Sequence, residues 1–193
     1  MRFLLLYAHP LADSYGAALH RATRDSLTRA GHAVDDCDLY AEGFDPVLSP
    51  EERRIYHDVP GNRRHVEDYV RRLEAAEGLA LVYPVWNFGF PAILKGFLDR
   101  VFLPGVSLRL ENGRAEPNLT RIRSLCAVTT YGASRLHAFL VGDPPRKCVT
   151  RVLGLATAPR AKVRYLAHYD MNRATDATRA AFLARVERTL AAV

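Results

Sequence analysis

The chain has 193 residues, of which 49% are hydrophobic and 25% charged, and its formal net charge is +6. This length fits one domain that can bury about 70% of the surface its unfolded form exposes, so no disulfide or metal is needed for stability. Cys37, Cys126 and Cys148 are far apart and odd in number, and their spacing matches neither a zinc site nor a thioredoxin motif. We therefore expect a single domain, residues 1–193, without a metal site and with Cys126 in the core.

The basic residues are interleaved with acids, as in Glu51–Arg54 and Val66–Arg72, which is typical of solvated helix faces. The chain has no zinc-finger spacing, no glycine-aromatic RNA-binding motif and no heptad repeat, so nucleic acid is not a predicted partner. The apolar run Phe3–Ala8 is too short for a signal peptide or a membrane span, which predicts a cytoplasmic protein without membrane insertion. The positive charge suits anionic ligands such as nucleotide phosphates.

Five apolar or alternating runs predict strands, and segments with helical periodicity separate them. In chain order the predicted strands are Arg2–Tyr7, Ala33–Tyr40, Leu79–Tyr83, Ile122–Thr130 and Lys162–His168. The predicted helices are one capped by Ser14 and stopped near Gly31, then Pro50–His57, Arg63–Ala76, Pro91–Phe102, two pieces within Leu136–Leu155, and a last one capped by Thr175. Strands that alternate with helices predict an α/β fold with a parallel, doubly wound sheet.

Local signals refine this prediction. Pro91 is expected at the first helical position, where its missing amide hydrogen has no consequence. Alternation from Val106 to Leu110, followed by the tight-turn dipeptide Asn112-Gly113, predicts a small hairpin. The segment Asp143–Pro145 is expected to separate two helical pieces.

The first candidate ligand site follows the first strand, where Ala8-His9-Pro10 leads to Ser14 and Tyr15 at a helix start. Free amide hydrogens at a helix start, with a hydroxyl and an imidazole nearby, suit an anion. The chain has neither a glycine-rich dinucleotide fingerprint nor a Walker loop, which disfavours a classical nicotinamide fold and an ATPase. An equally good local interpretation is that Ser14 only caps the helix and His9 only packs.

Two more candidate sites follow the third and fourth strands. The turn Pro84–Gly89 is rich in proline and aromatic residues, so a planar ligand would meet a stiff wall and exposed backbone amides. The segment Thr129–Ser134 offers hydroxyl groups, and Gly132 allows a ligand to approach the backbone closely. A buried core turn and an ordinary glycine-serine loop are the simpler alternatives.

Strands one, three and four are neighbours in a sheet of order 2-1-3-4-5, so the three segments are expected at one edge. A phosphate would lie at the first segment and a flat ring between the other two. Retaining a cofactor at micromolar level takes about 8 kcal/mol, whereas one helix-end anion contact supplies about 0.3–2 kcal/mol. Such a ligand therefore needs all three segments.

These segments resemble the flavodoxin-like NAD(P)H:quinone oxidoreductases. The similar segments are Ala8–Pro10 with Ser14–Tyr15, Phe44–Ser49 through Glu52 and Tyr56, Tyr83–Gly96, and Thr129–Gly132. The resemblance covers almost the whole chain and is most specific in the proline-to-lysine block that ends at Lys95. Asn87-Phe88-Gly89 is also similar to the FMN-dependent azoreductases. The resemblance implies a three-layer flavodoxin-like fold.

The resemblance also implies a tightly held flavin, in a homodimer with active sites at the subunit interface. Its phosphate or pyrophosphate would be held by His9, Ser14 and Tyr15. The flavin ring would be lined by Pro84, Val85, Trp86, Asn87 and Phe88, and its polar edge would meet Thr129, Thr130, Tyr131 and Gly132. Both FMN and FAD, and both NADH and NADPH, are compatible with these residues.

One departure concerns the segment after the fourth strand. Mammalian members have two consecutive glycines after the paired threonines, and this chain has Tyr131 in the first place. The tyrosine and histidine that assist hydride transfer in those members have no clear match here. Tyr131 and His137 are the candidates for these catalytic roles, and each fits a packing role equally well.

The predicted activity is hydride transfer from NAD(P)H through N5 of the flavin to a quinone or similar acceptor, in a two-step ping-pong sequence. Azo or nitro reduction is an alternative within the enzyme class. A flavin-binding regulatory subunit of a membrane transporter is an alternative from another class. A one-electron carrier is disfavoured because such carriers are typically acidic and this chain is basic.

Overall fold

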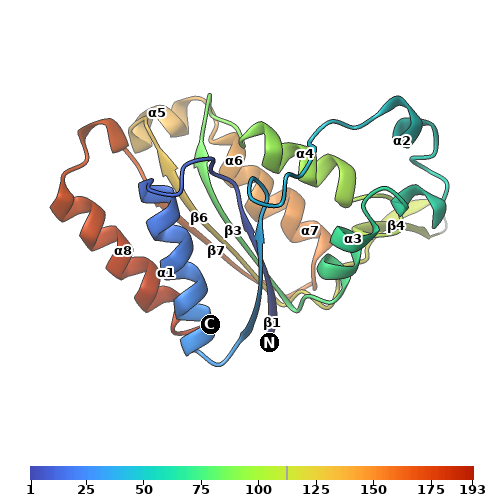
Figure 1. Cartoon of the computed structure of the whole chain (residues 1–193), viewed down its shortest axis with the longest axis horizontal. Helices are drawn as coiled ribbons and strands as arrows, with labels where there is room; N and C mark the ends of the chain where they lie inside the picture. The colour runs from blue at the N-terminus through green and yellow to red at the C-terminus, as the bar shows by residue number, and fades with distance from the viewer. Residues whose placement is uncertain (112) are drawn as a thin grey trace.

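The computed structural model describes residues 1–111 and 113–193 and has three layers, with a sheet between two sets of helices (Figure 1). Five parallel strands form the sheet in the order β2-β1-β3-β6-β7. They are β1 (Arg2–Tyr7), β2 (Ala33–Asp38), β3 (Gly78–Val85), β6 (Ser124–Tyr131) and β7 (Lys162–His168). The predicted α/β class, the five strands and the order 2-1-3-4-5 are confirmed.

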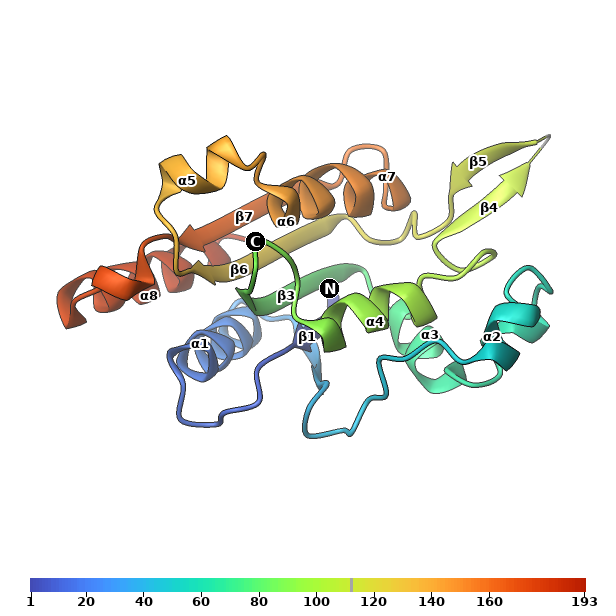
Figure 2. The same ribbon diagram turned by 90° about the horizontal axis from the view of Figure 1, so that it is seen from above.

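Two helices cover one face of the sheet, and a larger group of helices covers the other face (Figure 2). The first pair is α1 (Tyr15–Arg29) and α8 (Asp176–Leu190), which pack against each other. The opposite face carries α3 (Glu67–Glu74), α4 (Ala92–Val101), α6 (Pro144–Lys147) and α7 (Gly154–Ala156). A six-residue π-helix, Cys148–Leu153, joins the last two.

Each central strand is apolar throughout because its side chains alternate between two cores. In β1, Leu4 and Leu6 belong to the core under α3 and α4, whereas Phe3 and Leu5 belong to the core under α1 and α8. Strand side chains alternate with a period of two, so a sheet covered on both faces needs continuous apolar runs. Cys126 is fully buried in the second core, as expected.

The remaining elements lie at the ends of the sheet. They are α2 (Pro50–Arg54), α5 (Arg135–Leu140), the 3-10 helices Gly61–Arg63 and Met171–Arg173, and the antiparallel strands β4 (Leu108–Glu111) and β5 (Arg114–Pro117). The predicted hairpin is therefore present, although Asn112 of its turn lies outside the described residues. The break between the two predicted helical pieces is also present, with Gly142 and Asp143 at φ +87° and +44°.

Two helix starts differ from the prediction. The helix expected from Arg63 begins at Glu67, because Arg63 ends a 3-10 turn and Val66, with φ −135° and ψ 22°, is not helical. Pro91 is the residue before α4 rather than its first residue, since its ψ of 143° is not helical. The fixed φ of proline allows both positions, so the sequence left this one-residue difference open.

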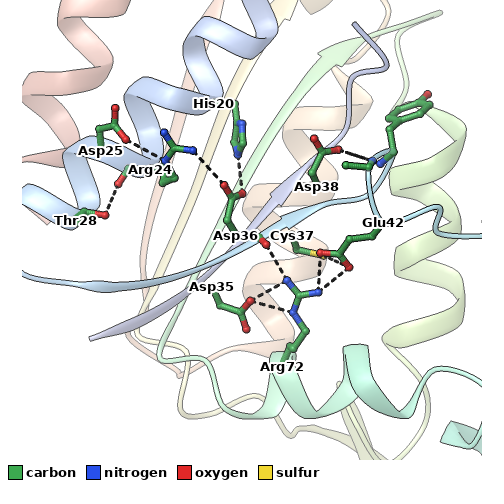
Figure 3. A network of polar contacts seen from close by, with 12 residues as sticks. His20, Arg24, Asp25, Thr28, Asp35, Asp36, Cys37, Asp38, Glu42 and Arg72 are labelled. Atoms are coloured by element: carbon green, nitrogen blue, oxygen red, sulfur yellow. Dashed lines mark hydrogen bonds and ion pairs between the residues drawn. The ribbon is translucent and has the colours of Figure 1, made fainter. Parts of the chain in front are cut away.

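Strand β2 is an edge strand, and acidic side chains cover it (Figure 3). Arg72 of α3 donates to the Asp35 carboxylate and the Glu42 carboxylate, at 2.8 Å each, and to the Asp36 carbonyl oxygen at 3.0 Å. His20 of α1 bonds the Asp36 carboxylate at 2.7 Å from the other side. These contacts fasten both helix layers to the edge, and the charges oppose pairing with another sheet.

The segment Phe44–Glu52 packs closely against α4. A Cβ added at Gly96 would collide with the backbone of Pro46, so only glycine allows this approach. Arg100 donates to the buried Glu52 carboxylate from Nε at 2.8 Å and from Nη2 at 2.6 Å, and it also bonds the carbonyl oxygen of Asp45. A steric fit and a buried ion pair therefore hold this segment.

Replacing Gly96 with alanine is expected to destabilise the protein, because the added methyl group has no space against Pro46. Overpacking of this kind lowers the free energy of unfolding by about 1–3 kcal/mol. Gly154→Ala is the matched control: its Cβ would meet nothing closer than 3.9 Å, and alanine favours a helix by up to about 1 kcal/mol. Chemical denaturation of both variants measures the difference, and equal stabilities would contradict the steric explanation.

The Glu52–Arg100 pair is expected to make stability depend on acid pH. Burial opposes ionisation of Glu52, but hydrogen bonds from the Ser49 amide and from Arg100 outweigh it, so its pKa lies below its ordinary value of 4.5. A lowered carboxyl pKa stabilises the fold above about pH 4.5, and the contribution is lost as pH falls through the folded-state pKa. The difference in free energy of unfolding between the wild type and Glu52→Gln should shrink between pH 7 and pH 3. A constant difference would show that Glu52 titrates normally.

Candidate functional site

The three predicted segments leave the sheet at neighbouring positions along its carboxyl edge, at the top of Figure 1. The amide of Ala8 donates to the carbonyl oxygen of Val82 at 3.0 Å, which places the end of β1 beside β3. In the adjacent pair of strands, β3 and β6, Pro84 lies opposite Thr130 and Val85 lies opposite Tyr131. The segments after β1, β3 and β6 are therefore brought together, as the predicted sheet order requires.

The segment after β1 presents several hydrogen-bond donors. Ser14 caps α1, because its side chain accepts from the Ala17 amide at 3.1 Å. The amides of Tyr15 and Gly16, the first two of the helix, donate to no other described residue. Nδ1 of His9 accepts from the Leu11 amide at 3.1 Å, so the neutral ring carries its proton on Nε2. The segment thus offers uncommitted donors to an anion.

Gly16 shapes the same segment and was not predicted from the sequence. A Cβ at this position would lie 3.4 Å from both the His9 ring and the Ser14 hydroxyl, so a side chain would fill the space between them. Glycine inside a helix is unfavourable by about 1 kcal/mol relative to alanine. A glycine in the first helical turn was therefore the available sequence signal for this open space.

The Tyr15 hydroxyl, predicted to help hold a phosphate, has a partner within the protein. Its hydroxyl donates to the carbonyl oxygen of Arg179 in α8 at 2.8 Å. Burial raises the pKa of Tyr15 to about 12, so the hydroxyl stays protonated in this contact. The side chain fastens α1 to α8, and only the backbone amide of Tyr15 remains free for a ligand.

The segment after β3 is a two-residue turn. Trp86 and Gly89 exchange both backbone hydrogen bonds, at 3.2 and 2.8 Å, while Asn87 and Phe88 lie between them with φ of 49° and 56°. Positive φ at both central residues is the geometry of a type I′ turn, which normally uses asparagine and glycine. The amides of Asn87 and Phe88 donate to no other described residue. The turn therefore presents two free donors at its tip.

Phe88 is the unusual residue of this turn. A bulky side chain at positive φ is an outlier, and such a conformation costs roughly 1–3 kcal/mol unless the surroundings impose it. Strained residues of this kind cluster at ligand-binding sites. The ring of neighbouring Trp86 is 42% exposed and lies 6.0 Å from the His9 ring. The first two segments therefore meet directly.

The segment after β6 contains one open position. A Cβ at Gly132 would meet the Asn172 side chain at an ordinary contact distance of 3.5 Å, so alanine could be accommodated there. Thr129 is fully buried with its hydroxyl oxygen unpartnered among the described residues, whereas Thr130 is partly exposed. Asn172 follows the last strand, and no pattern in the sequence singled it out.

The two candidate catalytic residues lie in different environments. The Tyr131 hydroxyl is 2.6 Å from both the Asp143 carboxylate and the Tyr165 hydroxyl, and Tyr131 is 1% exposed. Tyr169 reaches the same carboxylate at 3.3 Å, and Tyr83 lies 3.4 Å from Tyr165. Burial and the neighbouring Tyr165 and Asp143 raise the pKa of Tyr131 well above its ordinary value. The Tyr131 side chain thus belongs to a buried hydroxyl network.

His137 is instead exposed on α5, with Nδ1 2.9 Å from the hydroxyl of Ser134, the residue that caps this helix. Its Nε2 has no partner among the described residues. The histidine is therefore accessible to a small molecule at the edge of the site, whereas Tyr131 is not.

The residues present fit a ligand with a phosphate at one end and a flat polar ring at the other. The segment after β1 offers two free amides, the Nε2 proton of His9 and the open space at Gly16. The turn after β3 offers two more free amides next to an exposed indole. Residues 1–189 match the family model described as a flavodoxin-like fold. The chain belongs to this family.

Two curated relatives are similar to this flavodoxin-like chain over part of their length. An uncharacterised NAD(P)H oxidoreductase of Haemophilus influenzae is 36% identical over 118 residues, which are 60% of this chain and 57% of the relative. The NAD(P)H dehydrogenase [quinone] 1 of Rattus norvegicus is 27% identical over 153 residues, which are 71% of this chain and 56% of the relative. The matched segments therefore span a little over half of these relatives.

Solved structures match the flavodoxin-like chain over its whole length. The protein Smu.1420 of Streptococcus mutans is 28% identical, with a TM-score of 0.88 and full coverage of both chains. An FMN-dependent NADH-azoreductase of Bacillus anthracis, in complex with FMN, shares the fold at 12% identity, with a TM-score of 0.79 and coverage of 99% and 98%. Within the described residues, no helix combines the length and apolar character that a membrane crossing requires.

The strained turn predicts an asymmetric response to substitution at Asn87, which is exposed. Glycine adopts positive φ freely, so Asn87→Gly should leave the free energy of unfolding almost unchanged. Valine should lower it by about 1–2 kcal/mol, because a branched side chain resists the left-handed conformation. Urea denaturation of both variants measures this difference. Equal stability of the two variants would show that residue 87 does not hold a positive φ in solution.

Proposed function

We propose that the protein is a flavin-dependent NAD(P)H oxidoreductase that passes two electrons to a quinone or similar acceptor. The observation that carries the proposal is the set of four uncommitted backbone amides, at residues 15, 16, 87 and 88, on two segments that meet at one sheet edge. The names of the NAD(P)H-dependent relatives and of the FMN-bound neighbour support the choice of cofactor and reaction class. The family match supports the fold on which such sites occur.

The chain's own residues have distinct parts in this proposal. The amides of Tyr15 and Gly16 and the Nε2 proton of His9 bind the flavin phosphate, since a helix start favours negative charge. The amides of Asn87 and Phe88 and the backbone at Gly132 orient the ring. The flavin, when bound, supplies the hydride chemistry, and the protein supplies position and electrostatics.

The second substrate site would lie over the exposed side of the ring. The indole of Trp86 is exposed there and offers a flat apolar wall on which the nicotinamide and then the acceptor can stack in turn. His137 is the better placed of the two candidates for moving a proton to the reduced acceptor, because its ring is exposed and the Tyr131 hydroxyl is committed to Asp143 and Tyr165.

A second copy of the chain would complete the site if the family's homodimer forms here. Leu136 and Leu140 are 65% and 69% exposed on α5, beside the segment that contains Gly132. Apolar side chains four residues apart share one face of a helix. This face provides apolar area that a partner subunit could cover.

The direct test is to purify the protein, measure its absorbance spectrum, and titrate it with FMN and with FAD. We expect a bound flavin, and steady-state oxidation of NAD(P)H that depends on a soluble quinone. An azo dye and a nitroaromatic compound, measured in parallel, distinguish the reductase alternatives. Protein that binds neither flavin would overturn the proposal. Flavin binding without turnover, together with a stable complex with a membrane transporter, would favour a regulatory subunit instead.

Substitution of Gly132 tests the contribution of the segment after β6. Gly132→Val should weaken flavin binding about ten- to hundredfold, equivalent to the roughly 1–3 kcal/mol of an overpacked contact, because the side chain would block approach to the backbone. Gly132→Ala is the matched control, since its Cβ has room beside Asn172. Fluorescence titration with flavin gives both affinities. If valine binds flavin as tightly as the wild type, the segment does not contact the ring.

A further inference from the structure

A hollow opens between α5, at the end of the sheet, and the helical stretch that begins with α6, and Figure 2 draws these two elements next to each other. Its volume is about 330 Å³. The side chains that matter for its chemistry are Arg135, Phe139, Asp143, Arg146, Lys147 and Arg151. Four of these six are cations, so the hollow is strongly basic.

The four cations form no ion pair with an acid in the described part of the chain. None of them lies within 4.0 Å of a carboxylate in the described residues, whereas Arg63, Arg72 and Arg100 are all held in ion pairs. Among the described residues, the only carboxylate that lines the hollow is that of Asp143, which already accepts from the hydroxyls of Tyr131 and Tyr169. Four cations and one carboxylate leave a net charge of +3, which attracts anions into a hollow of this size.

One of these cations is held over an aromatic ring, and a second lies beside the turn between α5 and α6. The guanidinium of Arg146 lies over the Tyr165 ring, 5.6 Å from its centroid. The Lys147 ammonium lies 3.4 Å from the position that a Cβ on Gly142 would occupy, at the turn between α5 and α6. Guanidinium groups bind phosphates as well as carboxylates through paired hydrogen bonds, and lysine binds phosphate as a point charge, so these side chains suit a phosphate ligand.

The hollow lies within reach of the proposed flavin ring. Arg135 follows Gly132 by three residues, and three residues of chain span at most about 11 Å. The Tyr131 hydroxyl also links the end of β6 to Asp143 at 2.6 Å. Phe139 is 74% exposed at the same hollow and offers a face for stacking a base. A dinucleotide stacked on the ring could therefore extend into this hollow.

We propose that this basic hollow binds the adenosine 2′-phosphate of NADPH and makes the protein prefer NADPH to NADH. The inference rests on the proposed function, because it assigns a binding site to the adenosine end of the same hydride donor. Both dinucleotides carry a diphosphate with two negative charges, which two cations neutralise. The other two cations together with Asp143 leave a charge of +1, so the hollow still attracts the 2′-phosphate, which adds about −1.5 to −2 near neutral pH.

The first experiment compares kcat/KM for NADPH and NADH in the flavin-loaded protein. The wild type should favour NADPH, and the double variant Arg135→Gln, Arg151→Gln should lose at least about tenfold in kcat/KM for NADPH, because it lacks two charge-assisted contacts. Its kcat/KM for NADH should change less than about threefold. Arg185→Gln removes a cation on α8 that is also exposed; it is the matched control and should alter neither value. Equal use of both donors by the wild type, or equal losses for both in the double variant, would overturn the inference.

The second experiment needs no activity. Calorimetry should show that adenosine 2′,5′-bisphosphate binds the wild type at least about tenfold more tightly than adenosine 5′-monophosphate or inorganic phosphate, and that the double variant loses this difference. If inorganic phosphate binds equally well, the hollow is a general anion site and the inference fails. Protein that shows this selectivity but oxidises neither dinucleotide would retain the phosphate site and reject the proposed function. Oxidation of both dinucleotides without this selectivity would retain the proposed function and reject the phosphate site.

Discussion

The parallel pairing of β1, β3 and β6 is the constraint on which the rest of the structure depends. Parallel neighbours end at the same edge, so the hydrogen bond from Ala8 to Val82 and the register of Val85 with Tyr131 bring three distant segments together. Such a sheet must be covered on both faces, which explains the two cores on either side of β1. The apolar strands and the polar strand ends thus both follow from the parallel pairing of these strands.

The chemistry of this edge comes from backbone groups more than from side chains. Amides at the start of α1 and at the tip of the turn after β3 have no partner among the described residues, and the conformation of Phe88 is strained to present them. A site of this kind suits a cofactor that carries its own reactivity and needs only to be held and oriented. In the proposed site, the surrounding side chains would set access, through the exposed indole of Trp86, and charge, through the cations beyond α5.

Much of the architecture could be predicted because its signals are local. Apolar runs gave all five strands, and the hydroxyls of Ser14 and Thr175 gave two helix caps that the structure confirms. The start of α3 was less predictable, because Arg63 fits a helical face by periodicity but belongs to a 3-10 turn. The commitment of the Tyr15 and Tyr131 hydroxyls could not be foreseen either, since their partners Arg179, Asp143 and Tyr165 are distant in sequence.

The sequence by itself determined the α/β class, the strands and the candidate ligand segments, because hydrophobic periodicity and helix caps act over a few residues. The order of the strands was expected from the flavodoxin-like topology, and the structure confirms it. Only the tertiary structure decided which side chains of those segments remain free. It buried the Tyr131 hydroxyl against Asp143, left His137 exposed, and gathered Arg135, Arg146 and Arg151 around one hollow. The physical reason is that burial and charge pairing depend on contacts between separate elements, which no local pattern records.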